Sequence, residues 1–567
     1  MEPVSTAAPP TQQAAPAAPG GTGAFPAVRH FRQILLWPLR LMPVPDGQGR
    51  PRRPWHLLRE LGESSPWREQ FDEYTGGADG FHERHYNEFV SFLPYVQRFL
   101  YGEGRAQRSA AGEAAESGSP MRVFRRRDIA HIRVVTQPGQ PPITLDIVHV
   151  DLYFYLDVDL VLLNLEVSAD GLTLQQAQEL LYRFGRGYPA GWDDAGQPLH
   201  CLAGVEWLGA GGEVLARSDA QQREAFLSHV CEHRAPRISA HWAFVLQPLV
   251  SDHSGEPGPL RFRQIEYYRM PVMGYLALDD PRALRRDDFV QLGLVTGAAG
   301  ALPYAESHLA DFDQRYCYDR FWTEAGRAPH TRYLCSGHSL IVVGDARAQF
   351  FGCRDRGVLA QFRHQHFMLF MIAHFQKAAL LMFSDRLVEA LKQLAISDPN
   401  SVRRFKRAIR ASFEGFLRFT HRYWFHEISQ QAQVRALYGM CRTHLGLDPL
   451  YAEVKERIAD MNSYLDADSL RRQANTVVRL TVVTIFGMVG TITTGFLGMN
   501  LLAEADAGWG RKLAIFAAVF VPTVALTLYT MVKSKRLSDF LDAVSDENLG
   551  AWQKVRALGA VWFRGRG

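Results

Sequence analysis

The most chemically informative part of the chain is an uncharged segment near its C-terminus that is rich in hydroxyl and glycine residues. Residues 480–503 contain no charged side chain but five threonines and four glycines. Positions three or four apart define one helical face: Gly495, Thr491, Met488, Thr484, Leu480 (or its neighbour Thr481) and Val477. Such a weakly polar face suits close helix packing in a bilayer. It equally suits the lining of a water-filled ion path with hydrophobic constrictions.

Two segments have the length needed to place this face inside a membrane. Residues 480–503 and 513–532 each meet the ~20 residues needed to cross a ~30 Å hydrocarbon layer. Trp509 and Tyr529 lie near the ends of the second segment, as interfacial aromatic residues do. Because two helices cannot enclose a water-filled path, an ion path requires a ring of several copies of the chain.

The flanking charges predict how the two spans are oriented. The outer flanks carry six basic residues: Arg471, Arg472, Arg479, Lys533, Lys535 and Arg536. The intervening loop carries two, Arg511 and Lys512. The excess of positive charge places both chain ends in the cytoplasm, so we expect a multi-pass protein of the cell membrane.

Upstream of the spans, the pattern predicts an α/β (or α+β) cytosolic domain followed by a helical stalk. Strands are expected at 31–43, 121–167, 241–249 and 339–345, and a helix at 172–184. Long helices are expected at 361–396, 401–445 and from 448 onward; the apolar stretch 367–383 within the first is expected to be buried in protein. The expected parts are a disordered tail 1–25, a cytosolic domain 26–360 with a flexible insertion 102–120, a stalk 361–478, two spans 479–533 and a cytosolic tail 534–567.

Composition excludes several classes of protein. The 567 residues are 47% hydrophobic, and 63 basic residues against 59 acidic ones leave a net charge of +4. That small excess gives no indication of nucleic-acid binding. The six cysteines form no CxxC pair, so neither a disulfide framework nor a zinc ribbon is expected.

The first span ends in Gly498-Met499-Asn500, followed by a short loop and a second span close to the C-terminus. At this place, after a long helix and an α/β region, the tripeptide resembles the signature of the CorA family of magnesium channels. The resemblance is specific over about 448–536 and only architectural upstream. It implies a CorA-like funnel, a homopentamer in the (inner) membrane, a pore lined by the first span, and Mg²⁺ as transported ion and regulatory ligand.

The resemblance also assigns roles by position. Asn500 would form an amide ring at the outer mouth, with Gly498 and Met499 holding its turn. The lumen would be lined by Gly495, Thr491, Met488 and Thr484 and narrowed by a hydrophobic gate of Leu480 and Val477. Neutral amide oxygens suit a hydrated Mg²⁺, which sheds its waters reluctantly.

Acidic residues supply two further expectations, each with a plainer alternative. In the loop, Glu504 and Asp506 would raise the local cation concentration, or are simply solvated charges. On the stalk, Asp460, Asp466 and Asp468 are candidates for a regulatory metal site, or are solvated acids, the reading we favour.

The chain departs from the family pattern in ways that bear on the metal. The loop LLAEADAGWG lacks the acidic pattern beginning Met-Pro-Glu, and a proline frequent in the first span is absent. Met499 favours Mg²⁺ or Co²⁺, since a zinc-transporting branch usually has valine there. We therefore expect influx of Mg²⁺, with Co²⁺ and Ni²⁺ as further ions, driven by the membrane potential. The alternatives are a Zn²⁺ or other transition-metal transporter and a non-conducting anchor for a sensor domain.

Other constellations predict no chemistry. Two groups of histidines have spacings that match no metal motif: His364-x-His366 with His374, and His421 with His426-Glu427. Cys335, His338 and Cys353 lack a clear fourth ligand for zinc. Gly209-Ala-Gly211 predicts a turn. With no nucleophile elbow or kinase signature, we expect neither an enzyme nor a covalently bound cofactor.

Overall fold

The computed structural model describes most of the chain. The described residues are 27–45, 51–70, 83–102, 120–266, 268–297, 303–392, 394, 399–503, 508–514, 516–518, 520–523, 525 and 529. They belong to two compact units, Met1–Lys455 and Glu456–Gly567. The expected tail 1–25, nearly all of the insertion 102–120 and the expected tail 534–567 lie outside the described residues.

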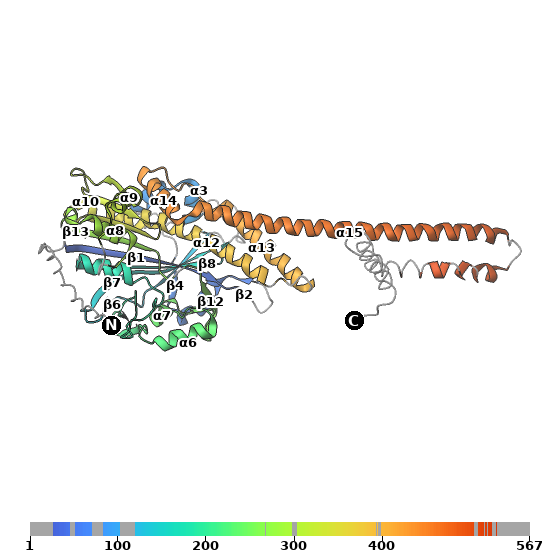
Figure 1. The fold of residues 1–567 in the computed structure, drawn as a ribbon, viewed down its shortest axis with the longest axis horizontal. Helices are drawn as coiled ribbons and strands as arrows, with labels where there is room; N and C mark the ends of the chain where they lie inside the picture. Colours follow the sequence, from blue (N-terminus) through green and yellow to red (C-terminus); the bar gives the residue numbers. More distant parts are fainter. Residues whose placement is uncertain are drawn as a thin grey trace, which may run out of the picture. The chain divides into compact units, whose positions relative to one another are not determined.

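The first unit is a mixed α/β structure built on a 14-stranded sheet (Figure 1). Its strands are β1 (Ala27–Leu41), β4 (Trp67–Gln70), β5 (Met121–Arg126), β6 (His131–Val135), β7 (Ile143–Tyr155), β8 (Leu160–Thr173), β9 (Gly204–Leu208), β10 (Val214–Arg217), β11 (Leu249–Ser251), β12 (Leu260–Gln264), β13 (Val272–Leu278), β14 (Cys317–Phe321), β15 (Thr331–Cys335) and β16 (Ser339–Asp345). A separate pair joins β2 (Val44–Pro45) to β3 (Pro51–Arg52).

The sheet runs in the order β10-β9-β6-β7-β8-β1-β13-β16-β15-β14, with β12 also pairing with β1 and β5 with β7. Most neighbours are antiparallel, whereas β13–β16 and β11–β12 are parallel. The long strand β1 therefore lies near the middle of the sheet, between β8 and β13.

The helices of the described chain lie in the connections between strands and in the segment that follows the last strand, β16. They are α1 (Pro54–Leu61), α2 (Glu83–Ser91), α3 (Pro94–Tyr101), α5 (Leu174–Arg183), α6 (Arg223–His233), α7 (Ala240–Leu246), α8 (Arg286–Leu294), α9 (Glu306–Tyr316), α10 (Gln349–Gly352), α11 (Val358–Gln361), α12 (Phe367–Lys392), α13 (Pro399–Tyr423), α14 (Ala432–Leu445) and α15 (Leu447–Ala503). Short 3₁₀ turns occupy Gly62–Ser64 and Pro281–Ala283, and a π-helical turn, η5 (Phe362–His366), precedes α12.

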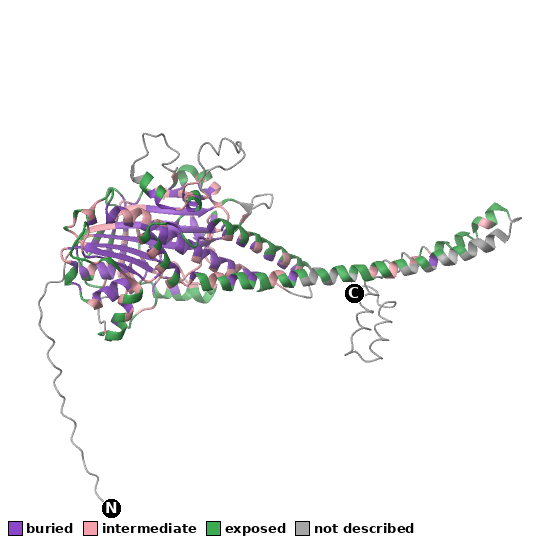
Figure 2. Cartoon of the chain, turned by 90° about the horizontal axis from the view of Figure 1, so that it is seen from above, coloured by how far each residue is buried: buried purple, intermediate pink, exposed green. Residues whose placement is uncertain are grey.

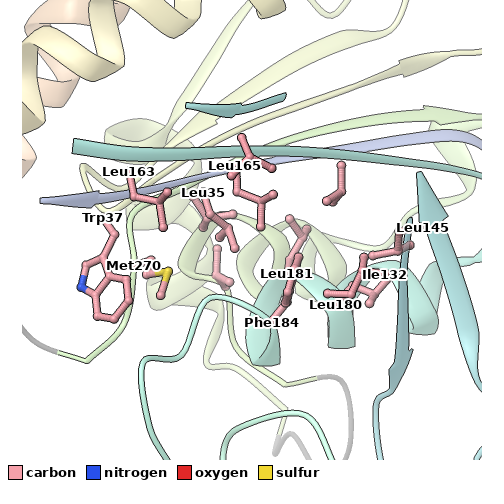
Figure 3. Packing of buried hydrophobic residues seen from close by; sticks show 14 of the residues in the cluster. Leu35, Trp37, Ile132, Leu145, Leu163, Leu165, Leu180, Leu181, Phe184 and Met270 are labelled. Carbon is pink, nitrogen blue, oxygen red and sulfur yellow. The ribbon is translucent and has the colours of Figure 1, made fainter. Parts of the chain in front are cut away.

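The strands of the sheet are largely buried (Figure 2). Strand β1 contacts α5 and α12, and it is buried without a break from Phe31 to Leu41. Side chains alternate between faces along a strand. Leu35 and Trp37 point into the hydrophobic cluster that includes Leu180 and Leu181 of α5 (Figure 3). On the other face, Arg40 pairs with Glu389 of α12 at 2.6 Å. A strand covered on both sides contains a continuous apolar run, as β1 does from Ile34 to Leu39.

Helix α12 confirms the expectation that 367–383 is buried in protein. Within the described residues, Val358–Lys392 is the one helical stretch long and apolar enough to cross a membrane by length and composition, and 78% of its most apolar window is buried inside the protein. Tyr155 of β7 stacks on Phe375 with ring centroids 3.9 Å apart. The sheet and neighbouring helices thus supply the apolar surroundings that a bilayer would otherwise provide.

Some of the expected elements are confirmed and two are wrong. The strands at 31–43, 121–167 and 339–345 and the helix at 172–184 are present, the latter opened by a capping box between Thr173 and Gln176. The run 241–249 is instead mostly helix α7, because its buried residues Trp242, Val245 and Leu246 follow helical spacing. The expected helix 401–445 is two helices, α13 and α14, separated by residues 424–431.

The second unit contains most of α15 and parts of a second helix. Gly446, at φ 63°, ends α14 in the left-handed conformation that glycine adopts at helix C-termini, and α15 begins at the next residue. Helix α15 then continues without interruption to Ala503. Beyond it, the described parts of 509–529 are helical. The two-span arrangement and the funnel belong to the proposal below.

Candidate functional site

The face predicted from sequence to line an ion path is exposed along α15 in the single chain. Val477, Leu480 and Met488 are 62%, 66% and 59% exposed. Thr484, Thr491 and Gly495 are also exposed. Because these positions are three or four residues apart on a continuous helix, the structure brings them onto one side of α15.

The threonine hydroxyls on this helix bond back to their own helix. Thr481 donates to the carbonyl of Val477 at 2.9 Å, Thr484 to that of Leu480 at 2.8 Å, and Thr491 to that of Gly487 at 2.9 Å. A hydroxyl that donates its only proton to a carbonyl keeps its oxygen lone pairs as acceptors. This face therefore offers hydrogen-bond acceptors, which suit the water shell of a cation.

A different face of α15 contacts the second helix. Gly490 is buried, and a Cβ built on it would lie 2.6 Å from Cγ2 of Thr523. At about 100° per residue, Gly490 lies roughly 100–160° around the helix from Thr491, Thr484 and Met488. Packing against the second helix and exposure of the predicted lining thus occur on separate sides of one helix.

The Gly498-Met499-Asn500 tripeptide does not form the turn that we expected. Its backbone is helical, and α15 ends only after Ala503. Five residues of regular helix separate Gly495 from Asn500, which corresponds to about 140° of rotation. Asn500 is therefore carried away from the exposed face, and the positions of the three side chains lie outside what the structure describes.

The acidic candidates are not brought together by the described structure. Glu504 and Asp506 lie outside the described residues. Asp460 and Asp466 are exposed on α15, and Asp466 accepts a hydrogen bond from Asn462 at 3.3 Å; of Asp468 only the helical backbone is described. In the described ranges, no group of three or more His, Cys, Asp or Glu side chains is arranged to hold a metal ion.

The histidine and cysteine constellations contact separate partners. His364 lies 3.3 Å from Glu88, whereas Nε2 of His374 lies 3.0 Å from the carbonyl of Gly337. Burial lowers the pKa of His366 and of His374 to about 3 each, so both are neutral. The sulfur of Cys335 contacts that of Cys441 at 3.4 Å. His366 and His374 are thus neutral side chains of the buried interior.

Sequence reasoning missed a buried charge cluster on the sheet face that meets α12. Glu166 of β8 accepts hydrogen bonds from Arg32 of β1 at 2.7 Å and from Arg363 of η5 at 2.8 Å. His149 lies 3.8 Å from the same carboxylate. Burial raises the pKa of Glu166, but Arg363, His149 and Arg32 hold it below its ordinary value. The sequence held one signal for this cluster: Arg32 and Glu166 are charged residues next to apolar runs within their strands.

A small cavity beside α5 is too confined for an organic substrate. It measures about 10 Å³, which is the room needed by one water molecule. Its walls include Arg183, Arg186, Ser239 and His241. This cavity therefore adds no support to an enzymatic function.

Comparisons of the chain with protein-family models, with curated proteins and with solved structures return no match.

Proposed function

We propose that the chain is one subunit of a homo-oligomeric channel for divalent cations of the CorA type, pentameric by that analogy, with Mg²⁺ as the favoured ion. The observation that carries the proposal is that two faces of α15 have different surroundings. One face packs against the second helix through Gly490 and Thr523, while the weakly polar face with Met488 and Thr491 is exposed in the single chain. Around a common axis, that second face would meet water instead of lipid.

Each part of the face has a role that follows from its chemistry. Hydroxyl oxygens of Thr484 and Thr491 would accept hydrogen bonds from the hydrated ion, whose waters Mg²⁺ releases slowly. One and two turns below Thr484, Leu480 and Val477 would form a hydrophobic constriction that closes by expelling water. A membrane potential supplies about 4.6 kcal/mol per 100 mV for a divalent ion, so transport needs no nucleotide site.

The amide ring at the outer mouth requires one local change. A regular helix carries Asn500 about 140° around from Gly495. The proposed ring therefore needs the backbone to leave the helix between these residues, and Gly498 offers the conformational freedom for that departure. The same observation favours the second candidate, a membrane anchor for a sensor domain in which Asn500 has no special role.

Ion flux distinguishes the candidates. The full-length protein is reconstituted in vesicles with a negative interior, and entry of Mg²⁺, Co²⁺, Ni²⁺ and Zn²⁺ is measured with the same indicator inside. We expect Mg²⁺ to enter and Asn500→Ala to reduce entry at least about tenfold, which is about 1.4 kcal/mol. Asn462→Ala, which removes an amide from α15 outside the span, is the matched control and should conduct normally.

Each other outcome selects an alternative. Zn²⁺ entry without Mg²⁺ entry would establish the transition-metal transporter. If none of the four ions enters, although the protein is folded and inserted, the chain is an anchor. Equal Mg²⁺ entry through wild type and Asn500→Ala would show that the chain is a channel in which Asn500 forms no selective amide ring.

A further inference from the structure

Two histidines on α6 lie side by side in the first unit, far in sequence from the proposed ion path. His229 and His233 are four residues apart on this helix, which Figure 1 labels at the edge of the unit. Their ring centroids are 4.4 Å apart. Imidazoles at i and i+4 share one helix face, which is the spacing that lets two histidines bind one metal ion.

The surroundings of the pair leave one ring nitrogen without a partner. Nε2 of His229 is buried and has no hydrogen-bond partner in the described chain. His253, on the connection that follows β11, is close enough to act electrostatically on His229. A buried nitrogen that makes no hydrogen bond is costly unless water or an ion completes it.

The charges near the pair are mixed. Nε2 of His233 lies 3.8 Å from the carboxylate of Glu232. The nearby cation Arg237 is engaged elsewhere, since it pairs with Asp219 at 2.9 Å and lies over the ring of Phe226. Burial lowers the pKa of His229; His233, Arg237 and His253 lower it further, and Glu232 opposes them. His229 is therefore neutral at pH 7, as a metal ligand must be.

We propose that His229 and His233 of α6 bind one transition-metal ion of the Zn²⁺, Ni²⁺ or Co²⁺ type. Two imidazole nitrogens would be supplied by the helix, and water would complete the coordination, because the described residues hold no preassembled set of three ligands. Mg²⁺ prefers oxygen ligands and would not occupy this site.

Binding by this pair does not depend on ion conduction, so the two proposals fail separately. The test titrates the purified full-length protein in detergent with Zn²⁺ and with Ni²⁺ in a calorimeter, at pH 7.5. Because other regions of the chain can also bind metal, the readout is the difference between variants. We expect His229→Ala and His233→Ala each to abolish one binding event or to weaken it at least about tenfold.

The controls are chosen to separate ligation from folding. His421→Ala removes an exposed helical histidine from α13 and should leave the titration unchanged. His233→Gln keeps a polar side chain at a partly exposed position, and circular dichroism verifies that each variant is folded. Acidification should weaken the binding event in wild type, because protons compete with the metal ion for imidazole nitrogens. Identical isotherms for wild type, His229→Ala and His233→Ala, or displacement of Zn²⁺ by Mg²⁺ at equal concentration, would overturn the proposal.

Discussion

Gly490 of α15 and Thr523 of the second helix approach so closely that a Cβ built on Gly490 would lie 2.6 Å from the Thr523 methyl carbon. Small residues allow helices to approach in this way in a bilayer, where van der Waals packing replaces the hydrophobic effect as the source of association. This contact also fixes which side of α15 faces its own chain. The exposed side that carries Met488 lies away from this contact and can face another molecule.

Replacing Gly490 by alanine should therefore destabilise the second unit. The added methyl has to displace Thr523, and overpacking of this kind costs about 1–3 kcal/mol. Thr523→Ser removes the obstructing methyl and keeps the hydroxyl, so the double variant should regain most of the loss. Thermal unfolding of the full-length protein in detergent would measure both effects.

Gly487 provides the control for this prediction. A Cβ built on Gly487 meets no atom within 4 Å, so Gly487→Ala should leave the melting temperature unchanged. If Gly490→Ala were as stable as Gly487→Ala, or if Thr523→Ser gave no rescue, the two helices would not pack at this contact.

A cysteine on the exposed face should make Mg²⁺ entry sensitive to Cd²⁺. Thiolates bind soft metal ions tightly, and several copies of Met488→Cys around one axis would hold Cd²⁺ in the path. We expect micromolar Cd²⁺ to block entry through Met488→Cys by about tenfold or more. Val478→Cys, on another side of α15, is the control. Equal sensitivity of the two variants would contradict a lining role for this face.

The sequence predicted well those elements whose pattern is local. Strand β1 and strand β16 follow from runs of apolar residues, and α5 follows from its period and its cap at Thr173. The exposed face of α15 also follows from spacing alone, because a continuous helix fixes which positions share a side. The prediction of one helix over 401–445 was wrong because the hydrophobic period does not show that α13 ends at Tyr423.

What the sequence could not predict depends on contacts between distant segments. The strand expected at 241–249 is a helix because Trp242 packs into a core whose shape is set elsewhere in the fold. Glu166 and Arg363 are 197 residues apart, and only the pairing of β8 with β1 and the position of η5 bring them together. The helical backbone at Asn500 likewise could not be foreseen from a resemblance that implied a turn.

The charge cluster should make Glu166→Gln strongly destabilising. The amide would leave the buried guanidiniums of Arg32 and Arg363 without their carboxylate. Removing one partner of a buried ion pair costs about 3–5 kcal/mol. Asp279→Asn, which breaks an exposed pair with Arg29, should change stability little and serves as the control. Chemical denaturation at pH 7 would measure the difference, and similar midpoints for both variants would exclude a structural role for the cluster.

The buried histidine His374 should make the first unit sensitive to acid well above the pH at which carboxylates titrate. Burial lowers its pKa to about 3, Lys377 adds to that effect, and the hydrogen bond to Gly337 opposes it. The unfolded chain takes up a proton near pH 6.5, whereas the folded chain does not until about pH 3. Stability is therefore lost as the pH falls through this window, at about 1.4 kcal/mol per pH unit for each such histidine.

His374→Gln keeps a polar side chain able to reach Gly337 but cannot be protonated, so its stability should fall less steeply than that of wild type between pH 6 and pH 4.5. His421→Gln, at an exposed position of α13, should retain the wild-type slope, and an unchanged slope in His374→Gln would show that His374 takes up its proton without unfolding.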